Sequence, residues 1–207
     1  MEININREEE YVFIDGLTAE EASGVWARLL RECPNFEVDF AFNVGAKVPK
    51  EFLAKIGASL LEESVKMQLL PENLAEQPTA DFVKIDEDNF EDFAAHHDKQ
   101  SPEMYWNSDR IWETLPKWEI FAVYESTNIS DYIMFSVPNA TVFAMDGKNT
   151  ANKKALLHLA AKKFFVISQS PIFFYAEKSV PDEQEIAGQM GFTPISNYCV
   201  YRIIVPS

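Results

Sequence analysis

Three lysines lie close together at the start of a predicted helix in the second half of the chain. Lys148, Lys153 and Lys154 flank Thr150, where a helix that runs to about Phe165 is expected to begin. A helix N-terminus disfavours cations, because the helix dipole places partial positive charge there. The conflict is explained if an anion such as a phosphate binds between the lysines and the backbone amides. The alternative, a solvated surface helix slightly destabilised by its own lysines, is equally compatible with the sequence.

Two further sets of residues have side chains suited to acid–base chemistry. Glu125 ends a predicted strand over 119–125 and is a candidate general base, acting through water on an amine nucleophile. The simpler interpretation is a solvated carboxylate at a strand end. His96 and His97 close an early helix. Adjacent helical residues point about 100° apart, so we interpret the pair as positive charge at a helix C-terminus and expect no metal site.

Composition and net charge argue against two classes of binding partner, nucleic acids and anionic membranes. The 207 residues are 47% hydrophobic, 13% aromatic and 25% charged, which is typical of a globular protein, and the formal net charge is −15. Such a field repels nucleic acid and anionic membranes, so we expect neither as a partner. Two isolated cysteines, Cys33 and Cys199, and an acidic first segment, MEININREEE, predict a cytoplasmic protein.

Common nucleotide and hydrolase motifs are absent. The seven glycines allow neither GxGxxG nor GxxxxGK[ST], and there is no HExxH or GxSxG. Dinucleotide, Walker-type, zinc-hydrolase and serine-hydrolase sites of the usual kinds are therefore excluded.

The elements that must position these residues form a divergent internal repeat. Four short matches occur in the same order in the two halves: Val12-Phe13 with Val142-Phe143, Asp15-Gly16 with Asp146-Gly147, Val48-Pro49 with Val180-Pro181, and Gly57 with Gly191. Each glycine is expected to end a short helix in the left-handed conformation. The matched blocks, 12–69 and 142–203, each predict strand, helix, strand, helix, strand.

The repeat predicts two units of unequal size. Residues 1–70 form a truncated unit, 71–79 a linker with proline and short polar residues, and 80–207 a complete unit. The complete unit has extra elements before the repeat: a strand near 81–85, helices over 88–97 and 108–115, and strands over 119–125, 131–137 and 140–145.

This order of elements resembles the GNAT (Gcn5-related) acetyltransferase family. The segment from Glu185 to Phe192, which ends Gly-Phe, is similar to a characteristic helix of the family, and Tyr198-Cys-Val-Tyr-Arg202 is similar to its closing strand. The stretch from Met104 to Leu115 is similar to one found in tandem members. The resemblance implies an α/β (α+β) fold, a mixed and mostly antiparallel sheet flanked by helices, with a partial second copy at the N-terminus. It also implies transfer of an acetyl group from acetyl-CoA to an amine of a small molecule or peptide.

The family's phosphate-cradling loop, Arg/Gln-x-x-Gly-x-Gly/Ala, corresponds here to Lys148–Lys153. Only the basic first position is kept, since Ala151 and Lys153 stand where the family has small residues. The resemblance implies cofactor contacts from this loop and from the strand before it, namely Phe143, Ala144, Met145, Lys148, Asn149, Thr150, Ala151, Asn152 and Lys153.

The resemblance leaves the catalytic acid open. The position of the family's frequent tyrosine is occupied by Ala187, and Tyr175 on the preceding strand is the nearest substitute, although a strand tyrosine more often serves packing. Glu125 and Tyr175 are the catalytic candidates. The alternative function is a GNAT-like scaffold that has lost catalysis and serves as a binding or interaction module. Its oligomeric state is not encoded in these features.

Overall fold

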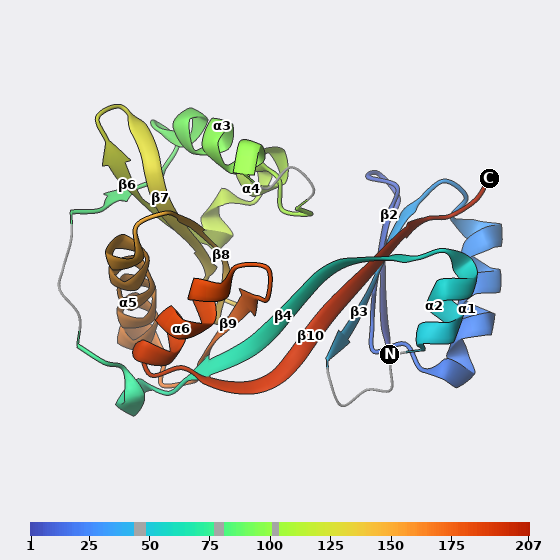
Figure 1. Cartoon of the computed structure of the whole chain (residues 1–207). Coiled ribbons are helices and arrows are strands. Elements are labelled where there is room, and N and C mark those ends of the chain that lie inside the picture. Colours follow the sequence, from blue (N-terminus) through green and yellow to red (C-terminus); the bar gives the residue numbers. More distant parts are fainter. Residues whose placement is uncertain (44–48, 77–80, 101–103) are drawn as a thin grey trace. The chain divides into compact units, whose positions relative to one another are not determined.

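The computed structural model describes residues 1–43, 49–76, 81–100 and 104–207, which form two compact units (Figure 1). Unit 1 consists of Met1–Lys66, Glu177–Ser179 and Ile195–Ser207, and unit 2 of Met67–Ala176 and Val180–Pro194. Val44, Val48 and residues 77–80, which include the end of the expected linker, lie outside the described residues.

Unit 1 is a sheet covered by two helices. Its elements are β1 (Glu2–Asn6), β2 (Tyr11–Asp15), α1 (Ala19–Glu32), β3 (Glu37–Asn43), α2 (Lys50–Ile56) and most of β4 (Ser59–Leu69) and β10 (Thr193–Ile204). The strand order is β1-β2-β3-β10-β4. Strands β2 and β3 are parallel over five registered pairs, from Tyr11 with Glu37 to Asp15 with Ala41.

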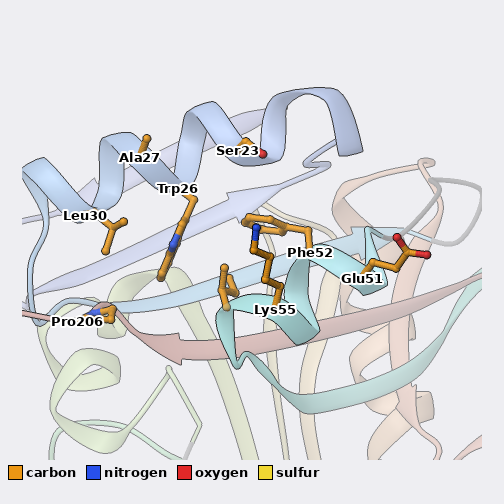
Figure 2. A pocket seen from close by; sticks show the side chains of 9 residues that line it. Ser23, Trp26, Ala27, Leu30, Glu51, Phe52, Lys55 and Pro206 are labelled. Atoms are coloured by element: carbon orange, nitrogen blue, oxygen red, sulfur yellow. The ribbon is translucent and has the colours of Figure 1, made fainter.

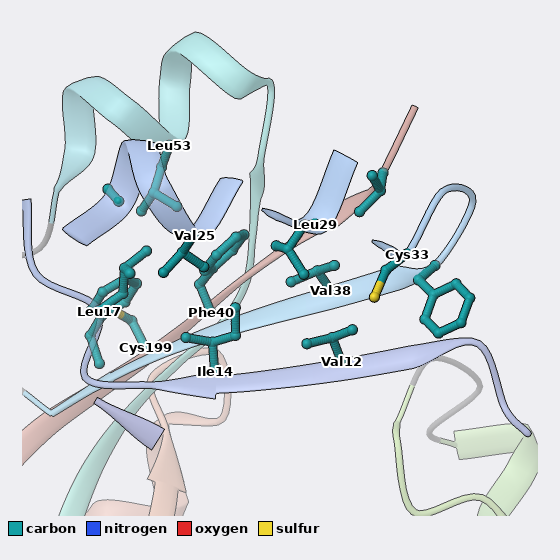
Figure 3. Packing of buried hydrophobic residues seen from close by; sticks show 14 residues of the cluster. Val12, Ile14, Leu17, Val25, Leu29, Cys33, Val38, Phe40, Leu53 and Cys199 are labelled. Carbon is teal, nitrogen blue, oxygen red and sulfur yellow. The ribbon is translucent and has the colours of Figure 1, made fainter. Parts of the chain in front are cut away.

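The core of unit 1 lies between the helices and the sheet. Figure 3 shows Val25 and Leu29 of α1 and Leu53 of α2 packed over strand residues that include Val12 and Phe40. The helix α1 begins at a capping box, in which Thr18 and Glu21 satisfy each other's backbone N–H groups. A surface pocket of about 640 Å³ between α1 and α2 is lined mainly by apolar side chains such as Trp26 and Phe52 (Figure 2).

Unit 2 contains the remaining elements. They are the 3-10 turns η1 (Pro71–Asn73) and η2 (Leu115–Lys117), strands β5 (Val83–Lys84), β6 (Trp118–Glu125), β7 (Asn128–Ser136), β8 (Thr141–Gly147) and β9 (Ile172–Glu177), and helices α3 (Phe90–Gln100), α4 (Ser108–Glu113), α5 (Thr150–Ile167) and α6 (Pro181–Gln189). The strand order is β4-β9-β8-β7-β6-β5. Pairing is antiparallel from β5 to β8, and β8 is parallel to β9.

Helices cover both faces of the sheet in unit 2. Asp131 and Tyr132 are consecutive on β7, so their side chains point to opposite faces. Asp131 bonds to residues at the start of α5, whereas Tyr132 packs against residues of α3. The fold is therefore the predicted mixed, mostly antiparallel α/β arrangement flanked by helices. The glycines expected to end the short helices have left-handed backbone angles, with φ of 82° at Gly57 and 96° at Gly191.

The last strand does not follow the predicted division at residues 70 and 80. Residues 195–207 were expected in the second unit, but they belong to unit 1, because β10 pairs antiparallel with β3 from Tyr198 with Asn43 to Ile204 with Glu37. Conversely, Met67–Leu69 of β4 were expected in the first unit, but they belong to unit 2. The order strand, helix, strand, helix, strand occurs in both halves, and the internal repeat and its division into tandem units stay predictions.

Candidate functional site

Strands β8 and β9 separate soon after they begin. Their registered pairs are Thr141 with Phe173 and Val142 with Phe174, and the rest of β8 has no register with β9. On the other side of β8, the register with β7 shifts by one residue at Phe143, which is therefore the extra residue of a β-bulge. Separation of neighbouring parallel strands at their carboxyl ends is where open α/β sheets commonly bind ligands.

The three predicted contact residues of β8 are largely buried. The Phe143 ring packs edge to face against Trp118, with centroids 5.1 Å apart, and Ala144 and Met145 belong to the buried core. Their main chain, and not their side chains, is the part that the separation of the strands leaves available.

The helix α5 caps its own amides. Asn149 is the N-cap residue, and its side-chain oxygen accepts from the N–H of Ala151 at 3.0 Å and of Asn152 at 3.3 Å. Its carbonyl accepts from the N–H of Lys153 at 2.9 Å. The helix thus begins within the loop that the resemblance assigns to a phosphate, and three amides of its first turn, those of Ala151, Asn152 and Lys153, are already paired.

A buried carboxylate occupies the space next to this helix start. Asp131 is 1% exposed. It accepts from the N–H of Asn149 at 3.0 Å, from Asn152 Nδ2 at 2.8 Å and from Ser130 Oγ at 2.8 Å. A carboxylate at a helix N-terminus takes the favourable electrostatic position that a bound anion would otherwise take.

The lysines of the loop divide into two kinds. Lys153 is buried, and its Nζ lies 3.1 and 3.3 Å from the carboxylate oxygens of Asp182, at the start of α6. Lys148 is exposed, and no ion pair of Lys148 occurs within the described part of the chain. Lys153 is therefore held by the protein, and Lys148 is the lysine of this loop that faces solvent.

These residues do not fit the pyrophosphate of coenzyme A at the start of α5. The amides of Asn149, Ala151, Asn152 and Lys153 all donate within the protein. A pyrophosphate would have to displace the Asn149 cap and lie beside the Asp131 carboxylate, so both hydrogen bonding and charge oppose it.

The two predicted catalytic residues lie on different strands. Glu125 is exposed at the end of β6, opposite Asn128 in the hairpin to β7. Tyr175 is half-buried on β9, and the order of the sheet places β7 and β8 between these strands. The roles of both residues stay predictions.

A polar cluster on the α3 face of the sheet contains the two adjacent histidines that the sequence singled out, together with partners that it did not indicate. His96 Nε2 is 3.0 Å from Asp146 Oδ2. His97 Nε2 is 2.7 Å from the Trp106 carbonyl, and His97 Nδ1 is 2.7 Å from the Tyr132 hydroxyl. Because a carbonyl only accepts, the His97 proton is on Nε2 and Tyr132 donates to Nδ1.

Burial lowers the pKa of His97, so the neutral ring is favoured. His96 and Asp146 are 50 residues apart, and no local pattern in the sequence predicts that they are in contact. The contact of Asp131 with Asn149, 18 residues later, was not predicted for the same reason.

Comparison with solved structures shows which fold this is. A GCN5-related N-acetyltransferase from Sphaerobacter thermophilus matches with a TM-score of 0.66 at 9% identity, covering 99% of this chain and 76% of that one. A GCN5-related N-acetyltransferase from Kribbella flavida matches with a TM-score of 0.61 at 9% identity, covering 93% and 80%. A tandem GNAT protein from the clavulanic acid biosynthesis pathway matches with a TM-score of 0.58 at 11% identity, covering 99% and 78%.

The chain has the fold of the GNAT acetyltransferases, as the resemblance predicted. No family model matches the sequence. No curated protein matches it either.

Proposed function

We propose that the chain is a GNAT-fold binding module in which the cradle for the acetyl-CoA pyrophosphate is closed by the protein's own groups. The observation that carries the proposal is the pairing of the α5 amides with Asn149 and Asp131. A buried carboxylate with three donors is a stable replacement for a bound anion, and its charge disfavours a second one.

The test is a thermal shift with acetyl-CoA. A ligand present at about 100 times its dissociation constant adds about 2.7 kcal/mol to the free energy of unfolding. We expect no shift of the native protein at millimolar acetyl-CoA. Asp131→Asn, which removes the charge beside α5, should show a measurable shift. The matched control is Asp109→Asn on α4, which also removes one carboxylate but leaves Asp131 and the ion pair of Lys153 in place, and it should behave like the native protein.

A clear shift of the native protein would contradict the closed cradle. Equal shifts of the two variants would show that total charge, and not the position of Asp131, controls the binding of the cofactor.

A second candidate is an acetyl-CoA-dependent N-acetyltransferase that transfers an acetyl group to an amine of a small molecule or peptide. The separation of β8 from β9 and the bulge at Phe143 favour it, because they leave main-chain groups of β8 available where the two strands part. In this candidate, residues 143–145 and 148–153 contact the cofactor, and Glu125 and Tyr175 are the catalytic groups.

Lys148→Glu separates this candidate from the first. If acetyl-CoA binds at the loop, reversal of this exposed charge should weaken binding at least tenfold, about 1.4 kcal/mol. Lys99→Glu on α3 is the matched control, since it makes the same change of charge outside the loop. Titration calorimetry at fixed ionic strength measures both. Lys153 is unsuitable for this test, because its replacement would also break the ion pair with Asp182.

The setting that we propose is the reducing cytoplasm, without nucleic acid or membrane partners. Both cysteines, Cys33 and Cys199, are free and buried, and the net charge of −15 opposes binding to polyanions. Among the described residues, no helix combines the length and apolar character that a membrane crossing requires.

A further inference from the structure

We propose that His96 and Asp146 form a general-base pair in unit 2, in which His96 Nδ1 accepts a proton from water that attacks an acyl ester or thioester. The inference goes beyond the proposed function and does not depend on coenzyme A.

The pair is built from two elements that the fold brings together. Asp146 stands on β8, opposite Tyr132 of β7, and both side chains point to the face covered by α3. His96 on α3 approaches Asp146 to 3.0 Å, and its ring packs edge to face on Tyr132 with centroids 5.7 Å apart. Two independent contacts thus fix the position of the imidazole.

The neighbouring residue holds α3 in place. His97 is fully buried and bonds to the Tyr132 hydroxyl and to the Trp106 carbonyl. These contacts of His97 also restrict the backbone position of His96, because adjacent residues on one helix cannot move independently. The groups that contact His96 are Asp146 from β8 and Tyr132 from β7. Asp92, His97 and Asp98 are its titratable neighbours on α3 itself.

The geometry assigns different roles to the two ring nitrogens. The carboxylate of Asp146 accepts hydrogen bonds, so His96 Nε2 carries the proton that lies between them. In the neutral ring, Nδ1 then has the free lone pair. A carboxylate that fixes the tautomer of a histidine, and that stabilises the imidazolium formed after proton transfer, is the usual arrangement of a histidine base.

The pair is reachable from solvent. The side chains of His96 and Asp146 are 18% and 36% exposed. The other two histidines of the chain, His97 and His158, are buried at 0% and 8% exposure. Asp146 also lies four residues beyond Val142, the last residue of β8 in register with β9, and thus in the part of β8 that has left its neighbour.

The reaction is balanced without a cofactor. As water attacks the carbonyl carbon of the ester, its O–H bond breaks and the proton passes to His96 Nδ1. A new C–O bond forms, and the bond to the leaving group breaks with its electron pair. His96 then returns the proton to the leaving group or to solvent, so that the products are a carboxylic acid and an alcohol, phenol or thiol.

The test uses 4-nitrophenyl acetate and the full chain. We expect hydrolysis faster than that given by an equal concentration of free 4-methylimidazole, and slower reaction in D2O. His96→Gln should lower the rate at least tenfold, within the usual range for loss of a general base. His158→Gln is the matched control and should keep the native rate.

Asp146 acts as a positioning residue and has its own readout. Asp146→Asn should lower the maximal rate and loosen the preference for the ring form protonated on Nε2, because an amide can present either its oxygen or its NH2 group to that nitrogen. A purely structural role would leave the tautomer, read from the nitrogen chemical shifts of the His96 ring, unchanged.

A second measurement keeps the proposal testable if a variant fails to fold. The nitrogen chemical shifts of the His96 ring in the native protein should show a protonated Nε2 and an unprotonated Nδ1 at high pH. The opposite tautomer, a native rate no faster than free imidazole, or full activity of His96→Gln would each overturn the proposal. None of these outcomes bears on acetyl-CoA binding at α5, so the closed cradle is judged separately.

Discussion

At the scale of single residues, Asp131 depends on the absence of a side chain at Gly147. Gly147 has φ of 138°, and a Cβ there would lie 2.0 Å from Asp131 Oδ1. Gly147→Ala should therefore lower the free energy of unfolding by about 1–3 kcal/mol. Urea unfolding measures the change.

The control for this prediction is another glycine-to-alanine change. Gly24 lies inside α1, and a Cβ there would meet nothing within 4 Å. Gly24→Ala should raise the free energy of unfolding by about 1 kcal/mol, because glycine is a poor helix former. Similar effects at the two positions would show that the close approach to Asp131 does not matter.

His97 makes stability depend on pH. Burial lowers its pKa in the folded chain, so protons bind more readily to the unfolded state. The contribution of His97 to stability is therefore fully present above the ordinary histidine value of about 6.5 and is lost as pH falls through the lowered value. The native protein should exceed His97→Gln in stability by less at about pH 5.5 than at about pH 7.5.

The difference in stability between the native protein and His97→Gln reports the contribution of His97 alone. Other groups titrate alike in both proteins, so their effects cancel in the difference between the two free energies of unfolding. Urea titrations at both pH values measure that difference. If it stays constant, or grows on acidification, His97 is not held neutral in the folded state.

At the scale of elements, Arg202 joins β10 to β3 through ion pairs with Asp39 and Glu37. The guanidinium of Arg202 contacts both carboxylate oxygens of Asp39, at 2.7 and 2.8 Å, and the Tyr11 hydroxyl donates to the same carboxylate. Asp39 is only 4% exposed. Arg202→Met leaves its carboxylate without the main counter-charge and should cost about 3–5 kcal/mol.

The double variant tests the cause. Asp39→Asn combined with Arg202→Met removes the stranded charge and should recover part of the loss measured in urea. No recovery would mean that the loss arises from the packing of the arginine stem and not from the carboxylate.

Local sequence patterns predicted the helices and strands better than they predicted which strands pair with each other. The helices α5 and α6 and the strand β9 were found because periodicity and helix-ending glycines are local signals. The pairing of β10 with β3 was missed, since a strand's hydrophobic pattern shows which face is buried and not which strand lies beside it.

The candidate site shows the same limit. The loop from Lys148 to Lys153 was located from its charges and from the resemblance, but the side chains that close it were not. Asp131 reaches this loop from β7, and Asp182 from α6. His96 and Asp146 meet only because α3 packs on the sheet. Contacts of this kind depend on tertiary structure, which a single sequence does not display.

At the scale of the whole molecule, both ends of the sequence contribute to unit 1. Residues 195–207 lie in the same compact unit as Met1–Lys66, and Met67–Leu69 of β4 join unit 2. A cut between residues 70 and 80, where the sequence suggested a linker, would therefore separate unit 1 from its own strand β10.

The charge of the whole chain leads to the last prediction. A net charge of −15 on 207 residues creates self-repulsion that is stronger in the folded state than in the expanded unfolded chain. Sodium chloride shortens the screening length from about 30 Å at 0.01 M to about 8 Å at 0.15 M. We expect the melting temperature to rise between these concentrations, because long-range repulsion is screened more than the short, partly buried ion pairs such as Arg202 with Asp39. An uncharged osmolyte at equal osmolarity serves as the control and should give a smaller increase. A fall on adding salt would show that attractive surface pairs, for example Arg28 with Glu32, outweigh the repulsion of the excess acids.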